Sequence, residues 1–309
     1  MKKIELSETT LKLIGRALMM LCLIFIFKKI LAIKGDLYET ILNRNLLLTC
    51  LVYSCIYGFS QLFLSYGWLL LLRSRIGTVP SMSWWIVWPL YGKAQLAKYI
   101  PGNVFHIVGR HLSAVKHGVG HRILLNAAIM EIIQLIASAT LISILAIEEI
   151  WPFFQTRFDF IIFALIGAAI ILVSSLTAYR AFIFEKFKKY AWLKIFASQF
   201  FYLVYLAISC LLFLIILSIT LSNATAIGKW QLVAGAYAFS WVLGFVVPGA
   251  PGGIGVRESA ILLSLSGSFP EESVLVSVVL FRFVSVAGDV IFFILSVCAE
   301  HIYKKVSVV

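Results

Sequence analysis

Long apolar segments separated by short polar connections are the feature that most constrains this chain. A helix rises ~1.5 Å per residue, so about 20 apolar residues are needed to cross the ~30 Å hydrocarbon core of a bilayer. Hydrophobic residues make up 61% of the 309 residues and charged residues only 13%, which is far from the balance of a soluble domain. We therefore predict an all-α, polytopic integral membrane protein with a single domain over residues 1–309. The clear spans are residues 11–33, 45–72, 123–147, 160–178, 195–221, 230–247 and 272–299.

The positive charges lie in short clusters between the apolar segments. The net charge is +12, and the connection after residue 178 carries Lys186, Lys188, Lys189 and Lys194. Such clusters mark cytoplasmic connections and attract anionic lipid headgroups. We therefore expect membrane lipids with anionic headgroups, and no nucleic acid, as partners, and we place both termini on the cytoplasmic side. The sequence leaves the oligomeric state open.

Two segments interrupt the series of spans. Residues 84–121 are too charged for an ordinary span and too apolar for a loop, and they predict a re-entrant hairpin or an interfacial helix pair. Residues 248–258 combine prolines and glycines, so their backbone groups need partners outside a helix ladder. At membrane depth such backbone is tolerated only inside protein or beside a wet cavity. The residues of the two breaks are Pro101, Gly102, Pro248, Pro251, Gly252, Gly253 and Gly255.

The charges at the two ends of the chain predict the number of crossings. If both termini are cytoplasmic, the number is even. Residues 248–270 are then expected to cross as a broken segment with a short helix, which brings the total to eight spans with two broken or re-entrant segments.

The two breaks share one spacing. Pro101 precedes Arg110 by the same number of residues as Pro248 precedes Arg257. This match predicts an internal repeat in which each half contributes a broken element, as transporters use to build sites near the midplane. Four spans counted between the copies favour a parallel over an inverted repeat. The half-repeats would cover about residues 45–150 and 192–299.

Charged side chains also lie inside the predicted spans. Arg282 lies about ten residues into the last span, and Asp289 follows two helical turns later. An Arg at this depth costs ~2.5–3.5 kcal/mol on insertion scales, so it should pair or face water. One interpretation is a buried ion pair that serves packing, with Asp289, Glu258 or Glu131 as the partner.

The other interpretation is a site in which basic side chains hold an anion such as a phosphate, because arginine offers a matching bidentate fork. Its acidic residues would orient the arginines or bind a cationic part of a headgroup. The candidate headgroup-binding residues are Arg257, Glu258, Arg282, Arg110, Lys98 and Glu131.

Four of the five histidines lie within or just after residues 84–121, namely His106, His111, His117 and His121. A metal site would need these side chains on one defined face together with further ligands, and no such pattern is evident. We expect no metal site, no cofactor and no catalytic cluster.

Three strings of residues together resemble a known family. Lys98 to Gly102 reads Lys-Tyr-Ile-Pro-Gly and precedes Arg110, residues 251–258 read Pro-Gly-Gly-Ile-Gly-Val-Arg-Glu, and Arg282 lies in the last span. With these strings the chain resembles, over nearly its whole length, the transmembrane domain of the lysylphosphatidylglycerol synthase/flippase family. This domain is the membrane half of the multiple peptide resistance factor, and it also occurs in stand-alone relatives.

The resemblance implies a lipid-handling protein of about eight spans in a bacterial cytoplasmic (inner) membrane. It also implies that the protein is a flippase. The best understood members of the family move an aminoacylated phospholipid between leaflets. The soluble aminoacyl-transfer domain of the full-length enzyme has no counterpart here, so we expect no synthase activity, and the lipid stays open.

The leading hypothesis is a flippase that moves a phospholipid or a polyprenyl-phosphate-linked lipid through a cavity lined by arginines. The alternative is a membrane-embedded transferase, or its accessory subunit, that acts on a lipid-linked sugar in cell-envelope synthesis. A transferase usually needs a carboxylate cluster that holds a metal ion and a nucleotide. No pair of acidic residues of this kind is evident in a cytoplasmic connection. A third interpretation is a scaffold or regulator of an envelope complex.

Overall fold

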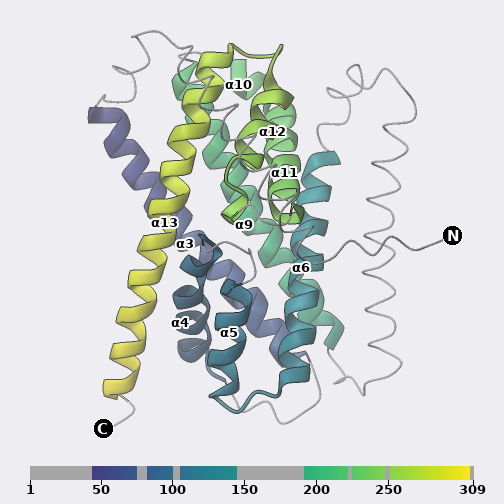
Figure 1. Ribbon diagram of the computed structural model, residues 1–309, viewed down its shortest axis with the longest axis vertical. Helices are drawn as coiled ribbons and strands as arrows, with labels where there is room; N and C mark the ends of the chain where they lie inside the picture. The colour runs from purple at the N-terminus through teal and green to yellow at the C-terminus, as the bar shows by residue number, and fades with distance from the viewer. Residues whose placement is uncertain are drawn as a thin grey trace, which may run out of the picture.

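The computed structural model describes residues 44–74, 82–99, 105–144, 191–221, 225–247 and 251–306 (Figure 1). The expected spans 11–33 and 160–178 lie outside these residues. The described part is built from helices and their connections and contains no strand, so the all-α prediction is confirmed for this part of the chain.

Four long helices run along the molecule: α3 (Arg44–Arg73), α6 (His121–Ile144), α9 (Ala191–Thr220) and α13 (Glu271–Val306). Each is long and apolar enough to cross a membrane, as expected for four of the predicted spans. Large apolar side chains such as Phe59, Phe200 and Phe283 point away from the interior. Such an exposed apolar surface fits a lipid environment.

Small residues let α3 and α13 approach closely. A Cβ atom added to Gly58 would lie 2.8 Å from the backbone oxygen of Gly288. Small residues at a helix crossing bring backbones together in membrane proteins, where packing rather than the hydrophobic effect holds helices to each other. This contact fixes α13, which carries several charged side chains of the site described below.

Shorter helices form two hairpins. The first hairpin consists of α4 (Trp84–Gln95), the 3₁₀ turn η1 (Leu96–Tyr99) and α5 (Phe105–Val115), so residues 84–121 form a helix pair as expected. The second hairpin consists of α11 (Trp230–Val246), the 3₁₀ turn η3 (Pro251–Gly253) and α12 (Val256–Leu265). The short helix α10 (Thr225–Gly228) leads into it.

The second hairpin corrects the expectation that residues 248–270 cross the molecule. α12 runs back beside α11 to the end of the molecule where α10 lies (Figure 1). The 17 residues of α11 and the 10 residues of α12 reach only ~25 and ~15 Å, less than the ~30 Å of a bilayer core. This hairpin therefore enters and leaves at one end of the molecule, and the count of eight spans stays a prediction.

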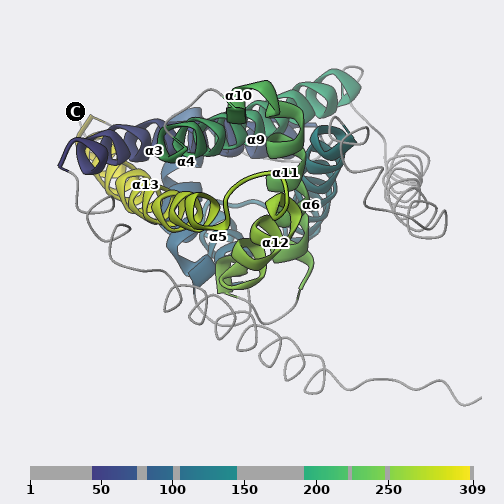
Figure 2. The same ribbon diagram turned by 90° about the horizontal axis from the view of Figure 1, so that it is seen from above.

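The two hairpins enter from opposite ends of the molecule and meet near its centre (Figure 1). η1 packs against η3 at this meeting point. Their opposite sense differs from the parallel arrangement that the sequence favours when α11 is counted as a complete crossing, and the repeat itself stays a prediction. In the view from above, α3 and α9 lie along one side, and α5 and α12 lie on the opposite side (Figure 2).

Candidate functional site

A cavity of about 100 Å³ lies where the tips of the two hairpins meet. Glycine makes the close approach of the tips feasible. Gly252 has a φ of 59°, and a Cβ atom there would lie 3.1 Å from Cε1 of Tyr99 on η1. An L-residue is strained in this left-handed region. The proline- and glycine-rich string thus forms a wall of a polar cavity, as its composition predicts.

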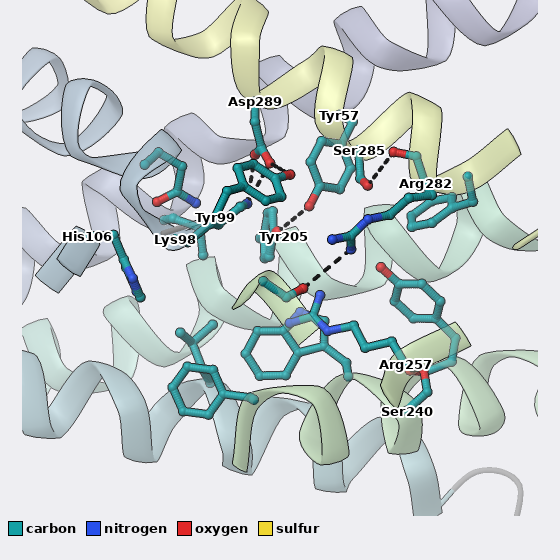
Figure 3. Close-up of a pocket in the computed structure, with 18 of the residues that line it drawn as sticks. Tyr57, Lys98, Tyr99, His106, Tyr205, Ser240, Arg257, Arg282, Ser285 and Asp289 are labelled. Carbon is teal, nitrogen blue, oxygen red and sulfur yellow. Dashed lines mark hydrogen bonds and ion pairs between the residues drawn. The ribbon is translucent and has the colours of Figure 1, made fainter. Parts of the chain in front are cut away.

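Arg257, in the first turn of α12, points into this cavity (Figure 3). Its side chain crosses Gly244 so closely that a Cβ atom there would lie 2.3 Å from its Cγ. The guanidinium carbon lies 5.1 Å from the ring centre of Trp241, a cation–π geometry. Within the described part of the chain, the buried Nε atom has no hydrogen-bond partner. Arg257 is therefore held in place by packing and leaves donor capacity free.

Arg282, on α13, approaches the same point from the other side (Figure 3). Its Nη1 atom donates to the carbonyl oxygen of Gly252 at 3.3 Å and lies 3.5 Å from Oε1 of Glu258. Its buried Nη2 atom has no partner among the described residues. Glu258 is itself held at the start of α12, where Oε2 accepts from the backbone N–H of Gly255 at 2.7 Å as in a capping box.

Asp289, also on α13, is fully buried and surrounded by donors. Oδ1 accepts from Nε2 of Gln61 and from Nζ of Lys98, both at 2.8 Å. Lys98 also lies 2.7 Å from Oδ2, and the hydroxyl of Tyr99 donates to Oδ2 (Figure 3). This cluster ties the tip of the first hairpin to α13 and neutralises the charge of Lys98.

Arg110 and Glu131 form a second buried pair, between α5 and α6. Nη1 of Arg110 donates to Oε1 of Glu131 at 3.0 Å, and Nη2 donates to Oε2. Tyr91 adds a hydroxyl donor to Oε1 at 2.8 Å. The guanidinium lies 4.5 Å from the ring centre of Trp68 and 4.4 Å from that of Tyr91. This arginine uses both of its Nη donors within the protein and packs against two aromatic rings.

The structure brings all six predicted headgroup-binding residues around one cavity, although they come from η1, α5, α6, α12 and α13. Of the predicted break residues, Pro251, Gly252 and Gly253 form η3 and Gly255 precedes α12. The remaining break residues, Pro101, Gly102 and Pro248, lie outside the described residues.

Several lining residues were not predicted. Asp289 was considered only as a partner of Arg282, whereas it binds Lys98 on a distant part of the chain. Aromatic residues also line the cavity. In the sequence they resemble the other residues of the apolar spans, so no pattern distinguishes them. These residues include Tyr57, Tyr91, Tyr205, Tyr237 and Trp241.

The charges around the cavity do not cancel. Among the described residues that line it, four cations, counted without histidine, face three carboxylates and leave an excess of one positive charge. A third nitrogen, Nδ1 of His106, is also buried without a partner in the described part of the chain. Each unmatched buried polar group costs ~1–3 kcal/mol. An anion with several acceptor oxygens would satisfy Arg257 and Arg282 together.

The described histidine, cysteine and acidic residues include no group of three that could hold a metal ion. His111 and His121 form a pair, with ring nitrogens 3.0 Å apart on the exposed face. Comparison with known proteins finds no matching family model and no match among curated proteins. The class of protein is therefore indicated by the fold and the site alone. It is an all-helical, polytopic membrane protein with a net-positive polar cavity.

Proposed function

We propose that this protein moves an anionic lipid, a phospholipid or a polyprenyl-phosphate-linked lipid, between the leaflets of a membrane. The observation that carries the proposal is a pair of arginines beside the hairpin tips, Arg257 on α12 and Arg282 on α13, each of which has one buried nitrogen without a partner in the described part of the chain. A headgroup phosphate offers acceptor oxygens that match a guanidinium fork. The apolar outer surface would keep the acyl chains in lipid.

The proposed orientation follows the positive charges. Lys116 follows α5, Arg122 is in the first turn of α6, and Lys304 and Lys305 are in the last turn of α13. The end of α5, the start of α6 and the end of α13 lie at one end of the molecule, and the start of α13, which carries Glu272, lies at the other (Figure 1). Positive connections are retained in the cytoplasm, so the end of α13 is the cytoplasmic side. The first hairpin then enters from the cytoplasm and the second from outside.

The proposed halves are inverted. In each half a hairpin lies between two long helices, α3 and α6 in the first and α9 and α13 in the second. Inverted-topology repeats with broken elements near the midplane are a recurrent transporter architecture, and relative motion of the halves alternates access to the central site. Here the motion would separate the tips η1 and η3, and the headgroup would pass between them. The family resemblance, with its flippase members, agrees with this proposal.

Translocation can be measured with purified protein in proteoliposomes that contain fluorescent phosphatidylglycerol. Quenching by a reductant added outside reports the fraction of probe that reaches the outer leaflet. We expect rapid exchange with the unmodified protein and about a tenfold slower rate for Arg257→Gln, which removes one charge-assisted contact. Lys305→Gln is the matched control, since it removes an exposed cation outside the cavity. Equal rates in empty and protein-containing vesicles would refute the proposal.

A further inference from the structure

The cavity has an excess of positive charge among its described side chains, which favours an anion. Binding of a cationic group would require a carboxylate or an aromatic face that is not already occupied. A headgroup with an ammonium group needs a carboxylate or an open aromatic face. Both kinds of group line the cavity. Whether either kind of group can receive an ammonium group depends on the partners that it already has.

The three carboxylates are occupied. Asp289 accepts from Gln61, Lys98 and Tyr99, and its side chain is fully buried. Glu131 accepts from both Nη atoms of Arg110 and from Tyr91.

Glu258 is the least enclosed of the three, with 13% of its side chain exposed. One of its oxygens accepts from the backbone N–H of Gly255, and the other faces Arg282. An ammonium group would have to displace a cation of the protein from any of these carboxylates.

The aromatic rings of the cavity wall have neighbours as well. Arg257 lies over Trp241, Arg110 lies beside Tyr91, and the ring of Tyr99 has Lys98 at 5.5 Å and Arg282 at 5.7 Å from its centre. The other lining rings pack on one another or on Trp241, namely Tyr57, Tyr205, Phe213, Tyr237, Phe245 and Phe281. Proteins recognise quaternary ammonium groups through open aromatic faces, and here a cation of the protein or a neighbouring ring contacts each of these rings.

We infer that the cavity selects lipids whose headgroup carries negative charge and no cationic group, such as phosphatidylglycerol or a polyprenyl phosphate. The inference rests on the proposed function and narrows its substrate class. It excludes headgroups with an ammonium group, because these would add positive charge to a cavity that already has an excess of it, and each described carboxylate there already has a partner. The aminoacylated lipid that the family resemblance implies belongs to the excluded group.

Competitive binding tests the selectivity directly. Purified protein in detergent is mixed with equal amounts of phosphatidylglycerol, phosphatidylcholine and lysyl-phosphatidylglycerol, and the bound lipids are counted by native mass spectrometry. We expect phosphatidylglycerol to exceed each of the other two about tenfold, as one favourable charge contact allows. Equal or preferred binding of lysyl-phosphatidylglycerol would overturn the inference.

A charge change within the cavity gives a second readout. Lys98→Gln leaves Asp289 with a neutral donor, which removes the excess positive charge. The share of lysyl-phosphatidylglycerol among the bound lipids should then rise several-fold, whereas Lys305→Gln should leave it unchanged. Should Lys98→Gln fail to fold, Arg257→Gln removes the same charge and should shift the share in the same direction. An unchanged share in a folded variant contradicts the inference.

Two further measurements complete the test. The first distinguishes binding of the lipid from binding of a free anion, and the second distinguishes headgroup selectivity from translocation. Soluble glycerol phosphate should not displace phosphatidylglycerol at matched concentration, and displacement would mean a site for a free anion. The same lipids are also followed in proteoliposomes. Selective binding without transport would leave the headgroup selectivity standing and refute translocation, whereas unselective transport would refute the selectivity alone.

Discussion

Arginine side chains have two different environments in this interior. Arg110 is enclosed by Glu131, Tyr91 and Trp68, so its charge is fully matched within the protein. Arg257 and Arg282 keep buried nitrogen atoms without described partners. The first environment serves stability, and the second serves binding in the account proposed here. The packing interpretation drawn from the sequence concerned Arg282, which lies 3.5 Å from Glu258. Arg110 was expected in the anion site and instead forms a buried pair with Glu131. The anion site itself stays a prediction.

Substitution of Arg110 should therefore destabilise the protein. Arg110→Met leaves the carboxylate of Glu131 buried without its cation, and breaking a buried pair in this way costs ~3–5 kcal/mol. We expect a lower thermal unfolding temperature in detergent, measured by tryptophan fluorescence. Lys116→Met, which removes an exposed cation just beyond α5, is the control.

The double variant Arg110→Met/Glu131→Gln removes both charges and should recover most of the lost stability. The loss of stability in the double variant is compared with the losses in Arg110→Met and Glu131→Gln. If it equals the sum of the two single losses, the two residues do not act as a pair.

At the scale of the elements, the hairpin tips depend on glycine. A Cβ atom at Gly253 would lie 2.6 Å from Nε of Arg257, and at Gly252 it would approach Tyr99 instead. Both glycines have a positive φ, 73° and 59° respectively. The tips therefore place the arginine and the tyrosine ring through backbone that carries no side chain of its own.

Gly253→Ala should therefore reduce binding of phosphatidylglycerol, because the added methyl group displaces the guanidinium of Arg257. The left-handed conformation adds a destabilisation of ~1–2 kcal/mol. Gly252→Ala should show a similar loss of stability with a smaller loss of binding, since its new contact is with Tyr99. Gly228→Ala is the control, because a Cβ atom added there would have no neighbouring atom within 4 Å and its φ is not in the left-handed region. Equal binding by all three variants would contradict the account of the tips.

The fold was predictable from sequence as far as hydropathy determines it. The long helices follow from apolar length alone, and the unusual composition of residues 84–121 and 248–258 located both breaks, although the second was expected to cross the membrane. The depth of α11 was not predictable, because its residues are as apolar as those of a full span and only its packing against α12 shows that it turns back.

The sequence carries even less information on which side chains pair with each other in the cavity. Lys98 and Asp289 are 191 residues apart in sequence, and no local pattern connects them. The residue types themselves were informative, because charged side chains in apolar segments must be accommodated in the interior. The six predicted binding residues therefore line one cavity, whereas their pairing depends on tertiary packing.

At the scale of the whole molecule, the opposite sense of the hairpins makes a topological prediction. The base of the first hairpin is marked by the exposed Lys116 and the end of the second by the exposed Glu272. In a variant without native cysteines, Lys116→Cys should react with an impermeant thiol reagent only from the cytoplasmic side. Glu272→Cys should react only from the outside. Reaction of both residues from the same side would contradict the inverted arrangement.

The central claim is that Arg257 and Arg282 together hold the phosphate of a lipid headgroup. Native mass spectrometry of the purified protein, with no lipid added, tests it most directly. We predict that the unmodified protein and Lys305→Gln retain an anionic phospholipid or polyprenyl phosphate, and that Arg257→Gln/Arg282→Gln loses it while it stays folded. Retention of the same lipid by the folded double variant would contradict the account.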